Sequence, residues 1–355
     1  MRMNSRGFTL IEMLVVIALL AIIMIGLLNL LDTSSKISVV QTELADTQEN
    51  VRFAAYHIMR TARMMGSSAL PFAADLGGTD SWFAGELISN AVNTAATPFG
   101  SVDVASGSDV LTMRGFFEIS PFFTDGTGVG GTSITISESN DDPTIINPTV
   151  SEVDTANLAG RGIFFMGKMD QREYAVGQIA AGSSWDDSLR ELTINFGPGT
   201  TQWSSLNPAG VDLTSSVPIE VHRVGVMESY TYYVDPDFTL QRMRADASGA
   251  TSEPVAVNIG NLQFELCVDT DFDNVCNGGW LAAPTATQVA AGSVIGMRIT
   301  VFGRTQREVP DWIEPMSTFQ TATGTTIADL NVNDLNRFAR WRRMEVAAAL
   351  RNYLF

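Results

Sequence analysis

The carboxylate of Glu12 is the first candidate for chemistry, because it stands alone in an apolar run. Phe8 to Leu31 is a stretch of 24 residues in which Glu12 is the single ionisable side chain. An ionised group at membrane depth costs at least a few kcal/mol, so such a residue usually has a function. We therefore expect Glu12 to meet a polar or cationic partner.

A second candidate is an acidic turn in the last third of the chain. Asp269, Asp271 and Asp273 alternate with other residues, and the Val275 carbonyl follows. Converging carboxylates and carbonyls bind calcium, and this spacing fits the first half of a calcium loop. The twelfth position is Trp280 rather than a bidentate glutamate. The segment thus predicts either a Ca²⁺ site or a solvated acidic turn.

Catalytic residues are scarce. The two histidines are His57 and His222, and neither stands in a nucleophile or zinc motif. The pattern indicates a protein that is not an enzyme.

The element that carries Glu12 is a membrane-spanning helix. Residues 8–31 would form roughly 36 Å of helix, enough for a hydrocarbon core of about 30 Å. Arg2 and Arg6 precede it, so residues 1–7 should be cytoplasmic and the chain after Asp32 should lie outside. The apolar run is too long for a secretory signal peptide. A plain anchor would leave Glu12 unexplained.

An amphipathic helix should continue this span. Apolar residues recur every seven positions, at Ile37, Leu44, Val51, Ile58 and Met65. Such a stripe is one face of a helix. Gly66 is a natural stop, which predicts a single helix over residues 8–65, about 87 Å long. Its first half needs lipid or other helices, and its second half (32–66) needs a sheet to lie on.

The rest of the chain, 67–355, should be a mostly β head, so the expected fold class is α+β with a largely antiparallel sheet. Residues 67–108 are expected to form loops with fragments of helix, and residues 125–215 could form an additional, elaborated part of the sheet. Residues 339–350 have helical composition, and a short helix is expected near 332–340. The expected strands are 110–113, 133–136, 162–166, 174–179, 191–196, 220–224, 229–234, 239–243, 262–268 and 294–302.

Cys267 and Cys276 should form a disulfide, because both fall on the expected outer side, where oxidation is permitted. A loop this short would stabilise the fold by roughly 2.5–3 kcal/mol in the chain-entropy picture. The alternative is a pair of buried thiols.

The charge balance is acidic, with 22 basic and 39 acidic residues and a net charge of −17. Nucleic-acid binding requires clustered lysine and arginine. A nucleic-acid partner is therefore not expected.

The N-terminal segment, Arg6-Gly7-Phe8-Thr9-Leu10-Ile11-Glu12, resembles that of type IV pilins and of the pseudopilins of type II secretion. The resemblance implies that prepilin peptidase removes the leader 1–7, cutting between Gly7 and Phe8, and methylates the Phe8 amine. Glu12 would then pair with the Phe8 ammonium of a neighbouring subunit. A buried ion pair of this kind specifies register more than it stabilises.

Later segments resemble PilW-type minor pilins. They are Tyr230–Asp235, Thr239–Arg242, Val257–Phe264, Arg298–Arg304, Arg342–Met344 and Leu350–Asn352. The resemblance implies a minor pilin in the inner membrane, with its head in the periplasm, that helps to prime or assemble extracellular pili. It also implies a final strand over 344–351, after the helix near 332–340, although the composition there equally fits a helix. Its partners would be other minor and major pilins, prepilin peptidase, the inner-membrane assembly platform and the bilayer. A minor pseudopilin and a membrane-anchored periplasmic adhesin or binding module are the alternatives.

Overall fold

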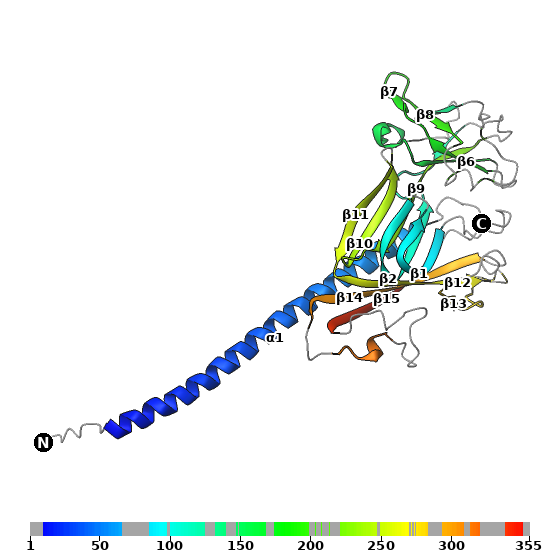
Figure 1. Cartoon of the computed structure of the whole chain (residues 1–355). Coiled ribbons are helices and arrows are strands. Elements are labelled where there is room, and N and C mark those ends of the chain that lie inside the picture. Colours follow the sequence, from blue (N-terminus) through cyan, green and yellow to red (C-terminus); the bar gives the residue numbers. More distant parts are fainter. Residues whose placement is uncertain are drawn as a thin grey trace.

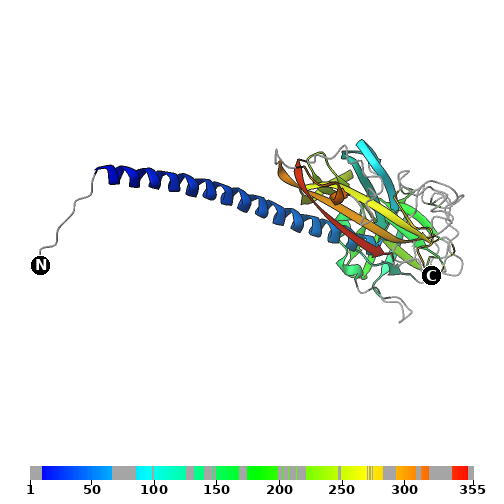
Figure 2. The same cartoon turned by 90° about the horizontal axis from the view of Figure 1, so that it is seen from below.

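The computed structural model consists of a long N-terminal helix and a β-rich head (Figure 1). It describes residues 10–65, 85–97, 100–124, 132–139, 147, 149–167, 174–198, 203, 207, 213, 221–246, 249–269, 271, 273, 275–282, 293–308, 313–319 and 338–350. In a second view the N-terminal half of the helix extends away from all the strands (Figure 2). The expected α+β fold is confirmed.

The helix, α1, spans Leu10–Met64 without interruption, as the sequence predicts. Its apolar stripe is buried from Thr47 onward, through Val51, Ala54, Ala55 and Ile58. Ile37, farther toward the N-terminus on the same stripe, remains 52% exposed. The helix therefore enters the head at about Thr47.

Two antiparallel sheets build the head. The larger has eleven strands, with the path β1-β2-β9-β5-β6-β8-β4, and β10, β11, β3 and β7 branch from it. These strands are β1 (Gly85–Thr97), β2 (Gly100–Gly115), β3 (Phe122–Phe123), β4 (Ser133–Ser137), β5 (Gly162–Met166), β6 (Tyr174–Ile179), β7 (Ser184–Asp186), β8 (Glu191–Gly197), β9 (Arg223–Val234), β10 (Thr239–Asp246) and β11 (Gly249–Val257).

The smaller sheet has the order β13-β12-β14-β15. Its strands are β12 (Ile259–Asp269), β13 (Trp280–Leu281), β14 (Ser293–Glu308) and β15 (Ala339–Ala349). Three 3-10 turns complete the described elements: η2 (Val150–Glu152), η3 (Thr155–Asn157) and η4 (Met316–Phe319).

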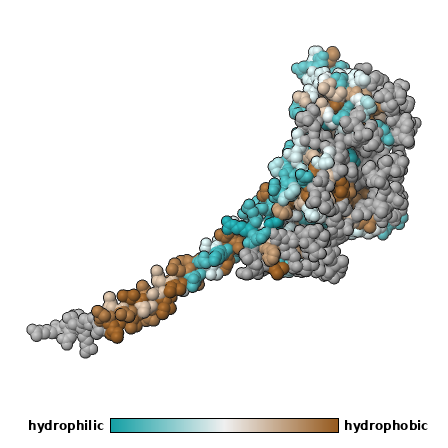
Figure 3. Space-filling model, in the orientation of Figure 1, coloured by the Kyte–Doolittle hydropathy of each residue, from teal (hydrophilic) through white to brown (hydrophobic). Residues whose placement is uncertain are grey.

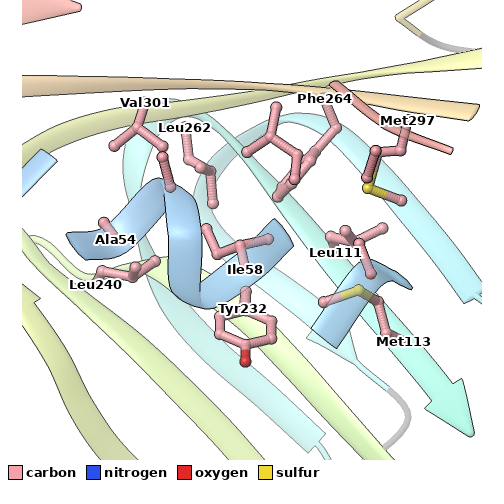
Figure 4. Close-up of a cluster of buried hydrophobic side chains, with 14 of the residues drawn as sticks. Ala54, Ile58, Leu111, Met113, Tyr232, Leu240, Leu262, Phe264, Met297 and Val301 are labelled. Carbon is pink, nitrogen blue, oxygen red and sulfur yellow. The ribbon is translucent and has the colours of Figure 1, made fainter. Parts of the chain in front are cut away.

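The main core lies between the two sheets, and the end of α1 fills it. Ala54 and Ile58 of the helix lie between Leu262 and Val301 of the smaller sheet and Leu240 of the larger (Figure 4). Gly303 on β14 permits the closest approach, because a Cβ there would stand 2.2 Å from Val51 Cγ2. The apolar face that the sequence predicts is thus buried on two sides.

Two predicted elements are wrong. Residues 67–108 were expected to be loop and helix fragments, yet 85–97 and 100–108 belong to β1 and β2. β1 is rich in alanine and asparagine, which are depleted in strands, and pairing with β2 outweighs this preference. The helix expected at 332–340 is contradicted at 339–340, where β15 begins; residues 332–337 lie outside the described residues.

The strand expected from Met344 therefore starts at Ala339, five positions earlier. Its alanine-rich composition favours helix, but pairing with β14 along its length fixes an extended backbone. Most of residues 125–132 and 199–216 fall outside the described part of the chain.

Candidate functional site

The N-terminal half of α1 is an apolar rod. The described side chains of residues 10–31 are all exposed, and their apolar surface is continuous in the face shown in Figure 3. α1 is long and apolar enough to cross a membrane, by length and composition. No described residue of the head covers this surface, which leaves it available to lipid or to other helices.

Glu12 lies in the first turn of α1, among exposed apolar neighbours that include Ile11 and Met13. Gly7 and Phe8, the residues of the expected cleavage, lie outside the described residues. The helix therefore presents one carboxylate near the start of a surface that is otherwise apolar.

The acidic turn lies at the end of β12, beside a disulfide. Cys267 and Cys276 are bonded, with their Cα atoms 5.6 Å apart. Ligand oxygens of Asp269, Asp271 and Asp273 lie within 4.8 Å of one another. Asp269 is fully buried, whereas the other two are exposed. The structure thus brings together the three carboxylates that the sequence singled out.

Hydrogen bonds within the turn hold these carboxylates in place. The Asp271 amide donates to Asp269 Oδ1 at 3.2 Å, and the Val275 amide donates to Asp273 Oδ1 at 2.8 Å. The amide of Asn277 donates to the Val275 carbonyl at 2.8 Å. That carbonyl, the fourth expected ligand, is therefore already an acceptor.

Electrostatic repulsion in this turn is considerable. Local desolvation and the carboxylates of Asp269 and Asp273 raise the pKa of Asp271. A bound cation would relieve this repulsion. Trp280, at the twelfth position, instead packs against Arg298, with the guanidinium carbon 4.4 Å from the ring centroid.

His57 lies at the contact of α1 with β9. Its Nδ1 is 3.2 Å from the Tyr232 hydroxyl, which also contacts Thr61 Oγ1 at 2.9 Å. Burial, and then the positive charges of Arg242 and Arg60, lower the pKa of His57. This arrangement is a polar contact within the helix–sheet interface.

A partly buried ion-pair network was not anticipated. Arg161 Nη1 donates to Glu118 Oε2 at 2.9 Å and to Glu228 Oε1 at 3.0 Å. Tyr230 donates its hydroxyl hydrogen to Glu118 Oε1 at 2.8 Å. These residues are 43 to 112 positions apart, except for the neighbours Glu228 and Tyr230, so no local spacing could have indicated the network.

The N-terminal segment matches a family model, the prokaryotic N-terminal methylation motif, over residues 2–28. The match includes Gly7, Phe8 and Glu12 and supports a type IV pilin-like or pseudopilin-like prepilin. It suggests a structural subunit and implies interaction with other pilins and with prepilin peptidase. Among curated proteins and solved structures, none matches the chain.

Proposed function

We propose that this chain is a minor pilin of the PilW type, a structural subunit that helps to prime or assemble type IV pili after prepilin peptidase has removed residues 1–7. The observation that carries this proposal is the exposed apolar half of α1 with Glu12 in its first turn. Such a surface needs other helices or lipid, and the carboxylate needs a cation there.

Processing at the matched methylation motif would supply that cation. Cleavage between Gly7 and Phe8 creates an ammonium at Phe8, close in sequence to Glu12. In an assembly of parallel helices, Glu12 of one subunit can pair with the Phe8 ammonium of the next. Loss of one member of a buried pair costs several kcal/mol, so a wrong register is disfavoured.

The partners follow from this role. Before assembly the chain resides in the inner membrane, with its N-terminus cytoplasmic and its head periplasmic. There it meets prepilin peptidase and the assembly platform. Afterwards it contacts other minor pilins and the major pilin in the extracellular filament.

The test is the ratio of mature chain in sheared filaments to mature chain in membranes. Glu12→Ala should be processed and inserted normally, since removing a charge makes membrane residence easier. Its filament-to-membrane ratio should fall about tenfold or more, because the partner's ammonium is left unpaired. Glu12→Gln should give an intermediate ratio.

Glu49→Ala is the matched control, because Glu49 is exposed on the polar part of the same helix and should leave the ratio unchanged. A wild-type ratio in Glu12→Ala would contradict the assembly role of this carboxylate.

A minor pseudopilin of a type II secretion system is the second candidate, favoured by the same motif. Deletion of the chain separates the two. Loss of surface filaments with normal protein secretion supports the minor pilin, whereas the reverse supports the pseudopilin. A chain found in membranes and never in filaments would instead fit an anchored adhesin or binding module.

A further inference from the structure

A cavity of about 410 Å³ lies in the head, and its lining includes neither Glu12 nor any residue of the acidic turn. Its walls are the loop between β2 and β3, the 3-10 turns η2 and η3, and β10. Its charged lining consists of Glu118, Glu152, Asp154, Arg161 and Arg244. Small-molecule sites typically measure about 300–1,000 Å³, so the cavity has room for a small ligand.

Arg161 lines this cavity and is held by two carboxylates. Its side chain is 9% exposed, and both of its ion pairs, to Glu118 and Glu228, use Nη1. These two contacts fix the position of the guanidinium group in the cavity lining.

Arg244 lines the same cavity and, within the described part of the chain, has a buried donor without an acceptor, which costs about 1–3 kcal/mol and favours a ligand that brings one. Its Nη1 stands 3.7 Å from Glu118 Oε1, beyond hydrogen-bond distance. Its Nε is buried and has no hydrogen-bond partner among the described residues. The two guanidinium groups thus share one carboxylate in the cavity lining. Guanidinium groups bind planar carboxylates through paired hydrogen bonds.

The cavity also has an acidic wall. Glu152 and Asp154 are exposed on η2 and just before η3. Asp154 accepts hydrogen bonds from the Ala156 amide and the Asn157 side chain, and Glu152 makes no ion pair with any described residue. These carboxylates repel a second negative charge on a ligand and attract an ammonium group.

We propose that this cavity binds a small zwitterion, an α-amino acid or a dipeptide. Its carboxylate lies against Arg161 and Arg244, and its ammonium faces Glu152 and Asp154. The aliphatic side chains of Ile119, Val153 and Leu158 on the cavity wall contact the carbon chain of the ligand. This binding is independent of the assembly role of α1.

The test is calorimetric titration of the full chain in detergent micelles. The zwitterionic probes are L-alanine, L-lysine, L-glutamate and L-alanyl-L-alanine. Acetate and inorganic phosphate are the anionic probes, and ethylamine is the cationic probe. At least one zwitterion should bind about tenfold more tightly than acetate or ethylamine, because only a zwitterion satisfies both walls.

Two variants locate the binding. Arg244→Gln should weaken it about tenfold or more, because a charge-assisted contact is lost. Glu152→Gln should weaken it several-fold, and since Glu152 is exposed this variant should fold normally. Arg223→Gln is the control, because Arg223 stacks on Phe123 outside the cavity lining.

The proposal is overturned if no zwitterionic probe binds the wild-type chain, or if phosphate or acetate binds as tightly as the best zwitterion. Unchanged affinity in both Arg244→Gln and Glu152→Gln would also overturn it.

Discussion

The three carboxylates beside the disulfide lie within 4.8 Å of one another, and calcium binding there stays a prediction. If the turn binds Ca²⁺, calcium should raise the melting temperature of the full chain in detergent. At a calcium concentration a hundredfold above Kd, the free energy of unfolding should rise by about 2.7 kcal/mol. Asp271→Ala should abolish the gain without disturbing the core, since Asp271 is exposed. Asp269→Ala should abolish it too.

Asp237→Ala is the control, because Asp237 is exposed in the turn between β9 and β10 and should keep the full calcium response. A melting temperature that does not change at millimolar calcium would identify a solvated acidic turn instead.

Glu228 should make stability depend on pH. Burial raises its pKa to about 7, against the opposing hydrogen bond from the Phe117 amide and the charge of Arg161. Between pH 4.5 and 7 the folded state therefore holds more protons than the unfolded state, so the free energy of unfolding falls as pH rises. Above pH 7 the full cost of the buried carboxylate, up to about 3 kcal/mol, is present.

Glu228→Gln removes this titration. Denaturant unfolding at pH 5 and pH 8 should show a smaller pH effect in the variant than in wild type, by roughly 1–3 kcal/mol. Glu49→Gln, exposed on α1, should retain the wild-type difference. Equal pH effects in Glu228→Gln and wild type would show that Glu228 is ionised throughout this range.

Short-range spacing is what made single residues predictable. Cys267 and Cys276 lie nine positions apart, and the three aspartates alternate, so local sequence constrains how they can meet. Arg161 and its two carboxylates come from distant segments that only the sheet brings together. No local sequence pattern indicates that these residues meet, and the cavity beside them could not be predicted from the sequence either.

At the scale of elements, the contact between α1 and β14 depends on Gly303. A Cβ at this position would stand 2.2 Å from Val51 Cγ2 and 2.8 Å from Thr47 Cγ2. Gly303→Ala should therefore displace the helix and destabilise the fold by about 1–3 kcal/mol, the usual effect of overpacking. Denaturant midpoints measured by tryptophan fluorescence would detect this loss.

Gly197→Ala is the matched control, since no atom lies within 4 Å of the added Cβ at the end of β8. Val51→Ala should recover part of the loss when combined with Gly303→Ala, because it removes the methyl group that clashes. If Gly303→Ala has the midpoint of Gly197→Ala, the helix does not pack as closely as described.

The spacing of apolar residues along the sequence predicted those helices and strands that have a strong apolar pattern of their own. α1 and the strands β5 and β6 match the predicted ranges closely, because each carries a strong helical pattern or a compact apolar run. β1 and β15 were missed in whole or in part, because the alanine and asparagine of β1 and the alanines at the end of β15 disfavour a strand. Their extended conformation comes from pairing with β2 and β14.

At the scale of the whole molecule, removal of the leader 1–7 should determine whether the chain can leave the membrane for the filament. The mature N-terminus should be N-methylated Phe8, measured by intact mass. Gly7→Val should leave the full-length chain in the membrane, because a branched side chain hinders the scissile bond. Gly26→Ala, within the apolar half of α1 and with open space around the added Cβ, should be processed normally. Met1 retained in the wild type, with the peptidase present, would contradict this.

The burial of α1 between two sheets has a mechanical consequence. A pull along the helix axis loads both sheets at once, because Ala54 and Ile58 contact side chains from each of them. Close-packed interiors have low compressibility and transmit strain, so the load passes into both sheets through the buried segment that begins at Thr47. The molecule is therefore built to carry tension between its apolar end and its head.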